Sequence, residues 1–244
     1  VHALRGVSMD VSASEGLGLV GESGCGKTTA ILALMGLLPP SATVAGEIRL
    51  GGDDLLARGE ASFRPHRWTD IAMVFQGAMN AFSPVATVGD QIAEPMRVHG
   101  VADGKSATRR VGELLDLVGI PPERAKRYPH EFSGGMRQRA AIAMALACEP
   151  KVLLADEPTT ALDVIVQAQV LDLLDRLRRE LGLAVVLVTH DLPVVAQVCQ
   201  RAAVMYAGEV VENGDIDALH TDPVHPYTRK LFEAARELEL GWSP

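Results

Sequence analysis

The sequence contains few aromatic residues and few cysteines. Phe, Trp and Tyr together make up 4% of its 244 residues, so aliphatic side chains and alanine must fill most of the interior. The three cysteines, Cys25, Cys148 and Cys199, lie far apart and do not show the spacing of metal ligands. Because an odd, scattered set provides no disulfide framework, a reduced, cytosolic compartment is expected.

Long apolar runs and an excess of positive charge are also missing. No stretch of about 18 apolar residues occurs, so no segment is expected to span a membrane. The formal net charge is −8, and nucleic acid is not expected as a partner because its phosphates require a basic surface. The chain begins without Met and without the basic and apolar regions of a signal peptide, so we expect a trimmed or incomplete N-terminus.

The pattern that is present predicts an α/β domain. Short apolar runs alternate with helical patterns, which favours a largely parallel sheet. Strands are expected at residues 8–11, 17–20, 47–50, 71–75, 152–155 and 184–189, and helices at 28–38 and 164–181. The intervening residues 81–146 are mostly helical in pattern, and we interpret them as a helical subdomain inserted into the α/β core.

The clearest chemical motif is a glycine-rich loop between a predicted strand and a predicted helix. It comprises Gly21, Glu22, Ser23, Gly24, Cys25, Gly26, Lys27 and Thr28, with Thr29 directly after it. Small residues allow backbone amides to turn toward phosphates, and the helix offers its positive end. Lys27 is expected to contact the β- and γ-phosphates of ATP, and the Thr28 hydroxyl to bind Mg²⁺. The alternative is a glycine-rich turn that matches by chance, but the flanking strand and helix favour phosphate binding.

A second motif is an apolar strand that ends in two carboxylates, Asp156 and Glu157. Ligands collect at the carboxyl ends of strands in open α/β sheets. Asp156 suits the Mg²⁺ shell, and Glu157 suits the polarisation of an attacking water. Alone, the motif is equally an acidic turn before Pro158, and the glycine-rich loop gives it its significance.

Two further motifs are weaker when taken by themselves. His190 follows a predicted strand, where it suits a contact with a γ-phosphate, although a lone histidine is more often structural. Ser133 is placed to cap a helix, and Gly134 and Gly135 leave the amides of that helix start open to an anion. The alternative interpretation of Ser133, Gly134 and Gly135 is an ordinary capped helix whose entry is flexible.

Taken in order, these motifs resemble those of the ATP-binding subunit of an ABC transporter. The segment Ser133–Gln138 resembles the family signature, and it departs from the commonest form by Phe132 in place of Leu, directly before it, and Met136 in place of Gln. The resemblance implies a P-loop NTPase fold with a RecA-like core, a mainly parallel sheet, a small antiparallel part and an inserted helical subdomain. It also implies an ATPase whose two subunits pack head to tail, so that Ser133, Gly134 and Gly135 of one cover the γ-phosphate held by the other.

The same resemblance assigns three more roles. Gln76 corresponds to the glutamine that touches Mg²⁺ and senses the permease, Asp163 to the residue that communicates across the dimer, and His190 to the switch histidine. With Glu157, the residues Gln76 and His190 are the expected catalytic residues. The implied organisation is one domain over 1–244, with the core in 1–80 and 147–222, the insertion in 81–146 and a C-terminal extension starting at 223.

A finer resemblance is to the subunits that drive oligopeptide, dipeptide and nickel import. It rests on the signature, on the segment around Asp156 and on His225-Pro226-Tyr227-Thr228, which resembles the opening of that group's C-terminal extension. It implies a second ATPase subunit, identical or paralogous, two transmembrane permeases and indirectly an extracytoplasmic substrate-binding protein. The chain would lie peripherally on the cytoplasmic face of the membrane. Peptides are the expected solute, with nickel or another small solute as the alternative.

Other questions stay open at this level. The aromatic residue that stacks on adenine in the family has no counterpart here, and the cysteine cluster of some longer relatives is absent. A soluble ABC-type ATPase of DNA repair or translation, or a regulatory module without turnover, shares part of the pattern. The permease is expected to dock near residues 76–99. There, five apolar side chains form either a surface groove or the core of the insertion: Phe82, Val85, Val88, Ile92 and Met96.

Overall fold

In the computed structural model of the chain, residues 2–77 and 81–240 are described, with side chains up to residue 235. Residues 1, 78–80 and 241–244 lie outside the described part, and with them parts of the predicted core, of the docking segment and of the extension. The contact pattern divides the chain into two compact units. Unit 1 comprises residues 1–65 and 184–244, and unit 2 comprises residues 66–183. The domain boundaries expected from the sequence stay a prediction.

Unit 1 is built on parallel strands with an antiparallel edge. Its strands are β1 (Gly16–Val20), β2 (Arg49–Leu50), β3 (Asp53–Asp54), β6 (Ala184–Thr189), β7 (Arg201–Tyr206) and β8 (Glu209–Asp215). Strand β1 pairs in parallel with both β6 and β7, whereas β8 is antiparallel to β7 and β2 is antiparallel to β3. Every residue of β1 and β6 is buried, as expected for parallel strands covered on both faces. The predicted mainly parallel sheet with a small antiparallel part is confirmed.

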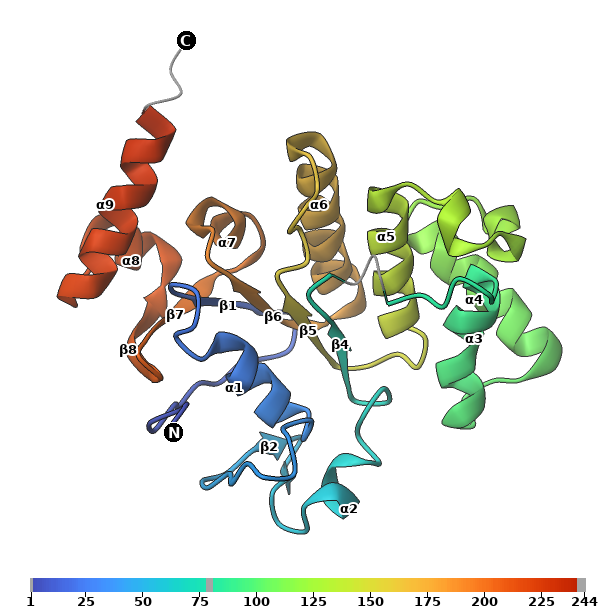
Figure 1. The fold of residues 1–244 in the computed structure, drawn as a ribbon, viewed down its shortest axis with the longest axis horizontal. Helices are drawn as coiled ribbons and strands as arrows, with labels where there is room; N and C mark the ends of the chain where they lie inside the picture. Colours follow the sequence, from blue (N-terminus) through green and yellow to red (C-terminus); the bar gives the residue numbers. More distant parts are fainter. Residues whose placement is uncertain (1, 78–80, 241–244) are drawn as a thin grey trace. The chain divides into compact units, whose positions relative to one another are not determined.

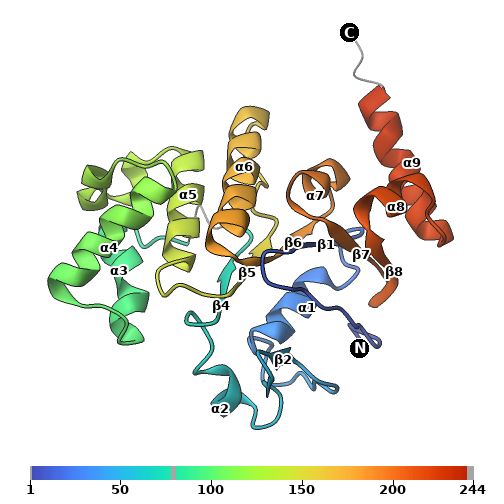
Figure 2. The ribbon, with the colours of Figure 1, turned by 180° about the vertical axis from the view of Figure 1, so that it is seen from behind.

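Helices cover both faces of the sheet in unit 1. The helices of unit 1 are α1 (Lys27–Leu34), α2 (Glu60–Phe63), α7 (Leu192–Val198), α8 (Ile216–Thr221) and α9 (Pro226–Leu240). Helices α1 and α7 lie on opposite sides of β1, β6 and β7 in both views (Figure 1 and Figure 2). A Cβ atom on Gly18 of β1 would overlap the Val195 side chain of α7. Glycine therefore permits the close approach of this helix to the sheet.

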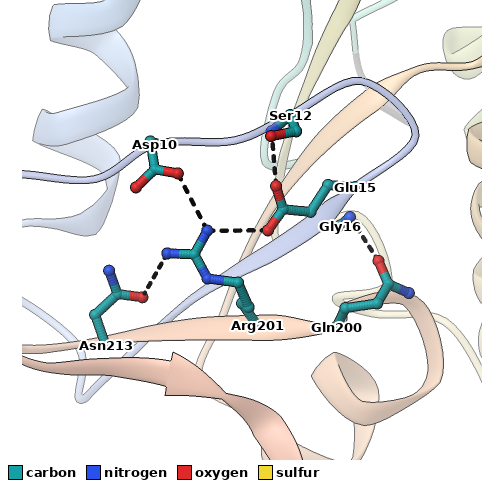
Figure 3. A network of polar contacts seen from close by, with 7 residues as sticks. All are labelled: Asp10, Ser12, Glu15, Gly16, Gln200, Arg201 and Asn213. Carbon is teal, nitrogen blue, oxygen red and sulfur yellow. Dashed lines mark hydrogen bonds and ion pairs between the residues drawn. The ribbon is translucent and has the colours of Figure 1, made fainter.

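The residues before β1 are held by side chains and not by strand pairing. Figure 3 shows Arg201, at the start of β7, between Asp10, Glu15 and Asn213. Its Nη1 lies 3.2 Å from Asp10 Oδ2 and 3.0 Å from Glu15 Oε1, and its Nη2 lies 3.4 Å from Asn213 Oδ1. The predicted strand at residues 8–11 is therefore wrong: the backbone there is irregular, and this network fixes it against β7 and β8.

Unit 2 contains two parallel strands and most of the long helices. Its elements are β4 (Ile71–Val74), α3 (Val88–Val98), α4 (Gly104–Leu117), η2 (Pro122–Lys126), η3 (Pro129–Glu131), α5 (Gly134–Ala145), β5 (Val152–Asp156) and α6 (Val164–Leu181). Helices α3, α4 and α5 gather together, coloured green to yellow-green in Figure 1. The helical character of residues 81–146 and the helix over 164–181 are thus confirmed. Within the described ranges, we find no helix whose length and apolar character suffice to cross a membrane.

Helix α1 ends earlier than the sequence pattern indicates. The prediction extended it to residue 38, but it ends at Leu34, because Gly36 adopts a left-handed φ of 61°. The Leu37 amide donates to the Leu32 carbonyl at 2.8 Å, and the Gly36 amide donates to the Ala33 carbonyl at 3.0 Å. This pair of bonds is a Schellman motif, which ends a helix at glycine before the following prolines can act.

The apolar residues that follow residue 81 belong mostly to the core of unit 2. Phe82, Val88, Ile92 and Met96 are all buried, and three of them lie on one face of α3. Val85 is 84% exposed. The interpretation as a surface groove is therefore wrong for four of the five residues, whose pattern is that of an amphipathic helix facing the interior.

Candidate active site

The glycine-rich loop lies in unit 1, between β1 and α1. Its glycines adopt conformations that other residues disfavour: φ is 154° at Gly21, 82° at Gly24 and 110° at Gly26. A Cβ atom on Gly21 would also overlap the Met205 carbonyl oxygen. Gly26 is the N-cap of α1 and has no side chain to bond the first amides of the helix, as a phosphate-binding helix start requires.

Lys27 is the charged group at the centre of this loop. Its side chain is 6% exposed, and its Nζ donates to the carbonyl oxygens of Gly21 at 2.6 Å and Glu22 at 2.8 Å. The Cys25 thiol, which is also buried, lies 3.7 Å from the same ammonium. The loop therefore wraps around a buried positive charge, an arrangement suited to anions.

His190 lies at the same edge of the sheet as the glycine-rich loop. Val20 of β1 and Thr189 of β6 are register partners, so Gly21 and His190 directly follow paired residues. Thr189 is buried, and its hydroxyl accepts a hydrogen bond from the Asp191 amide at 3.0 Å, which fixes the turn around His190. The structure thus brings His190 and the start of the loop to the carboxyl ends of neighbouring strands, where ligands bind in such sheets.

In unit 2, Glu157 is held by two side chains. Gln76 Nε2 and Thr160 Oγ1 each lie 2.9 Å from Glu157 Oε2, and both donate to it. The register partners Val74 and Ala155 bring the ends of β4 and β5 to one edge, which explains how Gln76 reaches a residue so distant in sequence. Two donors on one oxygen fix the orientation of the carboxylate.

The backbone of Glu157 is also unusual. Its φ is 45°, in the left-handed region that non-glycine residues rarely occupy. Conformations of this kind cost about 1–3 kcal/mol and persist where the surroundings enforce them, often at active sites. Asp156, directly before it, is 2% exposed at the end of β5. The two carboxylates predicted as a pair therefore differ: Asp156 is buried, and Glu157 is partly open to solvent.

The signature residues open helix α5 and contact the start of α6. The Ser133 hydroxyl accepts a hydrogen bond from the Met136 amide at 3.3 Å, as the capping prediction requires. A Cβ atom on Gly135 would overlap the side chain of Val166 in α6. Asp163 caps α6 by accepting from the Val166 amide at 3.0 Å. Within unit 2 these predicted residues are thus brought together by packing of two capped helix starts.

The thiols and acidic groups indicate no further chemistry. All three cysteines lie in the described residues, are buried and form no disulfide. Burial, with a smaller contribution from Glu149, raises the pKa of Cys148 to about 11, so this thiol stays protonated. Among the side chains described, those of residues 2–77 and 81–235, no three His, Cys, Asp or Glu groups are gathered as a metal centre.

Two residues near the site were missed by sequence reasoning. Thr160 bonds Glu157 from three residues further on, and the turn that begins at Pro158 is its weak sequence signal. Tyr227 accepts a hydrogen bond from the Glu22 amide at 3.0 Å through its hydroxyl. No local pattern indicates a contact between residues 205 positions apart.

Comparisons with known proteins agree with this geometry. The family model described as ABC transporter matches residues 4–160, well over half of the chain. The chain belongs to the ABC transporter family. It is an ATP-binding and ATP-hydrolysing cassette of that family, with the P-loop NTPase fold predicted from the sequence.

Individual relatives match the cassette almost from end to end. It is 50% identical to a probable peptide ABC transporter ATP-binding protein of Sinorhizobium fredii, over 98% of this chain and 73% of that protein. It is 50% identical to the dipeptide transport ATP-binding protein of Bacillus subtilis, over 99% of this chain and 73% of the relative. It is 48% identical to the oligopeptide transport ATP-binding protein of the same organism, over 98% of this chain and 68% of that protein.

A solved structure supports the fold independently. The dimeric, post-hydrolysis state of the ATP-binding cassette MJ0796 with ADP and Pi aligns with a TM-score of 0.76 and 30% identity. The alignment covers 88% of this cassette and 90% of that chain. The adenine-stacking residue that sequence reasoning left unassigned stays so.

Proposed function

We propose that this chain is one of two ATPase subunits that power the import of peptides. The observation that carries the proposal is the 48–50% identity, over 98–99% of the chain, to proteins named for peptide, dipeptide and oligopeptide transport. The Glu157 site and the glycine-rich loop supply the chemistry such a subunit needs. Nickel or another small solute is the alternative cargo within the same reaction.

The glycine-rich loop binds the phosphates of ATP in this proposal. Amides of the loop and of the α1 start, including those of Lys27, Thr28 and Thr29, surround the phosphate groups. The Lys27 ammonium, which bonds the Gly21 and Glu22 carbonyls, turns its charge to the β- and γ-phosphates. Ser23, Gly24, Cys25 and Gly26 complete the loop by keeping its backbone close to the ligand.

Three oxygen ligands suit Mg²⁺: the Thr28 hydroxyl, the Asp156 carboxylate and the Gln76 amide oxygen. The donor set fits a hard cation that prefers oxygen. Asp156 is a buried carboxylate at the end of β5, and Gln76 bonds Glu157 through its nitrogen, which leaves its oxygen for a ligand role. When bound, the ion neutralises charge on the β- and γ-phosphates.

Glu157 and His190 act on the γ-phosphate. Glu157 orients and polarises the attacking water, and Gln76 and Thr160 hold its carboxylate in place. The strained backbone of Glu157 supports this role, because strain at a buried strand end must be maintained by its surroundings. His190 contacts the γ-phosphate from the edge of the sheet that it shares with the glycine-rich loop.

A second cassette, identical or paralogous, completes the site. Ser133, Gly134 and Gly135 present the start of α5 to the γ-phosphate held by the partner, and Asp163 communicates between the subunits. Supporting this arrangement, Val164 is 82% and Ile165 is 73% exposed directly after Asp163. Two adjacent exposed apolar side chains of this kind are suited to burial against a partner subunit. The cassette MJ0796 was itself solved as a dimer.

The remaining partners follow from the importer assignment. Two transmembrane permeases hold the cassette pair at the cytoplasmic face of the membrane, and a substrate-binding protein on the other side delivers the solute to them. The segment after Gln76 is the proposed permease contact, and the exposed Val85 is its apolar member. The formal charge of −8 gives no support to a nucleic-acid partner, which disfavours a role in DNA repair or translation.

The test is isolation of the intact membrane complex through an affinity tag on this chain. We expect two permeases and a second cassette to co-purify, and the substrate-binding protein encoded with them to bind short peptides in calorimetry. Binding of Ni²⁺ but not of peptides by that protein would move the assignment to the alternative cargo. Recovery of the chain with ribosomes or DNA and without permeases would contradict an importer role.

A further inference from the structure

The C-terminal segment of unit 1 reaches back to the glycine-rich loop. Tyr227, in the first turn of α9, accepts a hydrogen bond from the Glu22 amide at 3.0 Å. Glu22 is the second residue of the loop, and the Gly21 carbonyl, in the same peptide unit as the Glu22 amide, accepts from Lys27 Nζ at 2.6 Å. One peptide unit thus separates the Tyr227 hydroxyl from the lysine of the phosphate site.

The segment that carries Tyr227 is itself anchored. Glu212 of β8 accepts from the Val224 amide at 2.8 Å and from the His225 amide at 3.0 Å. The Tyr227 amide in turn donates to His225 Nδ1 at 3.2 Å. Burial raises the pKa of Glu212, but its interaction with Thr228 and the hydrogen bonds from the two amides outweigh that effect, so the pKa lies below its usual value. An ionised Glu212 therefore keeps this turn in place.

The aromatic ring of Tyr227 is fixed as well. It packs against Tyr206, at the end of β7, with ring centroids 4.5 Å apart and planes tilted by 41°. Two residues further on, the Gly208 amide donates to the Cys25 carbonyl at 2.9 Å, so the same strand end supports the middle of the loop. The position of the Tyr227 hydroxyl is therefore fixed by the contacts of its ring and of its backbone.

The hydroxyl stays neutral over the working pH range. Burial raises the pKa of Tyr227 above its usual value, although the hydrogen bond from the Glu22 amide opposes this effect. A neutral phenol is an acceptor of modest strength that does not repel a nearby phosphate as a carboxylate would. Its bond to the Glu22 amide is thus compatible with an anion in the loop.

We propose that Tyr227 is a positioning residue for ATP: it fixes the entry of the phosphate loop and couples that loop to residues 223–240. The inference rests on the proposed phosphate-binding role of Lys27 and deepens it. A loop that is held in its binding conformation before the ligand arrives loses less entropy on binding. A partner that displaces the start of α9 would accordingly weaken ATP binding without touching the nucleotide.

The test compares two substitutions that each remove one phenol hydroxyl. Tyr227→Phe removes the bond to Glu22 and retains the ring contact, and Tyr206→Phe, on the neighbouring ring, is the matched control. The purified full chain is studied by calorimetric titration with MgATP, by steady-state ATPase kinetics and by amide hydrogen exchange resolved at Glu22. Lys27→Ala serves as the reference for loss of the phosphate site.

For Tyr227→Phe we expect the Kd and KM for ATP to rise about three- to tenfold, the range expected for loss of one hydrogen bond. The kcat at saturating ATP and the midpoint of thermal unfolding should stay unchanged, and exchange at Glu22 should accelerate. Tyr206→Phe should match the wild-type chain in all of these measurements. A purely structural role would instead lower the unfolding midpoint and accelerate exchange throughout α9.

Three outcomes would overturn the inference. One is a wild-type Kd in Tyr227→Phe while Lys27→Ala abolishes binding, which leaves the proposed function intact. Another is an equal rise of the Kd in Tyr206→Phe, which would assign the effect to the ring pair and not to the hydroxyl. The third is failure of the wild-type chain to bind ATP, which would overturn the proposed function together with this inference.

Discussion

The two units, each taken by itself, contain functional parts of different kinds. In unit 1 the phosphate loop is shaped by backbone: glycines at positive φ, carbonyls around Lys27 and amide bonds to neighbouring strands. In unit 2 the parts are side chains that hold side chains, with Gln76 and Thr160 on Glu157. The backbone-built glycine-rich loop is thus suited to hold a ligand, and the side-chain-held Glu157 carboxylate is suited to act on one. Substitutions should separate the two tasks.

The largest effect is expected from Glu157→Gln. The substitution removes a carboxylate and leaves the phosphate loop unchanged, so we expect kcat for ATP hydrolysis to fall about 10²–10⁴-fold with an unchanged Kd for ATP. Phosphate release and equilibrium binding, measured on the same preparation, check this. Glu180→Gln, at an exposed glutamate of α6, should behave like the wild-type chain. ATPase activity close to wild type in Glu157→Gln would remove that residue from the catalytic role.

The next effect concerns the backbone of the phosphate loop. Gly21→Ala combines an unfavourable φ of 154° with overlap of the Met205 carbonyl, and should cost about 2–4 kcal/mol of unfolding free energy and abolish ATP binding. Gly24→Ala is the matched control, because its Cβ would have nothing within 4 Å. Its left-handed φ alone should cost about 1 kcal/mol. Chemical denaturation and ATP titration compare the two, and equal losses would show that crowding at Gly21 is unimportant.

The glycine at the other helix start should respond differently. Gly135 has no left-handed φ, and its Cβ would overlap the Val166 side chain, so Gly135→Ala should cost about 1–3 kcal/mol through crowding. Val166→Ala, made in the same chain, should restore most of that loss, which a double-mutant cycle of unfolding free energies measures. If the two changes in unfolding free energy were simply additive, crowding between the side chains at 135 and 166 would not be the cause of the loss.

The smallest expected effect is a dependence of the unfolding free energy on pH in the acidic range. Asp70 Oδ1 lies 2.7 Å from Lys151 Nζ, and Oδ2 lies 2.9 Å from His66 Nδ1. Burial raises the pKa of Asp70, but these bonds outweigh it, and the pKa lies below its usual value. A lowered pKa in the folded state means that the stabilisation is complete above the unfolded pKa of about 3.9 and is lost as the pH falls through the folded value.

Asp70→Asn should therefore lower the unfolding free energy at neutral pH by about 1 kcal/mol or less, since solvent screens the exposed Lys151. The difference from the wild-type chain should shrink as the pH falls through the folded pKa of Asp70 and vanish below it, which urea unfolding across the acidic range tests. Asp172→Asn, at an exposed residue of α6, is the control. A difference that does not shrink on acidification would point to packing and not to charge.

Much of the fold could be predicted because its determinants are local. The helix over 164–181 and the strand over 184–189 follow directly from periodicity and burial. The end of α1 was missed because a glycine motif stopped the helix before the prolines. The strand at residues 8–11 was wrong because Arg201, far along the chain, organises that segment through side chains.

The site divides in the same way. The positions of the glycine-rich loop, Glu157 and His190 after strands were predictable, since the motif has fixed residue types at fixed spacing, and their chemical roles stay predictions. The groove interpretation after residue 81 was wrong because one apolar pattern serves equally for a surface and a core. The contact of Tyr227 with Glu22 depends on how strands β7 and β8 return the chain to the loop, which no local pattern encodes.

The positive φ of Glu157 has a consequence for engineering of this cassette. Glycine adopts a left-handed backbone without the strain that glutamate carries, so replacement of the proposed catalytic carboxylate by glycine should raise the free energy of unfolding. Any selection that counts only surviving folded protein will therefore drift toward inactive sequences at residue 157. Stabilised variants of this ATPase must therefore be selected by their ATPase turnover and not by their thermal stability alone.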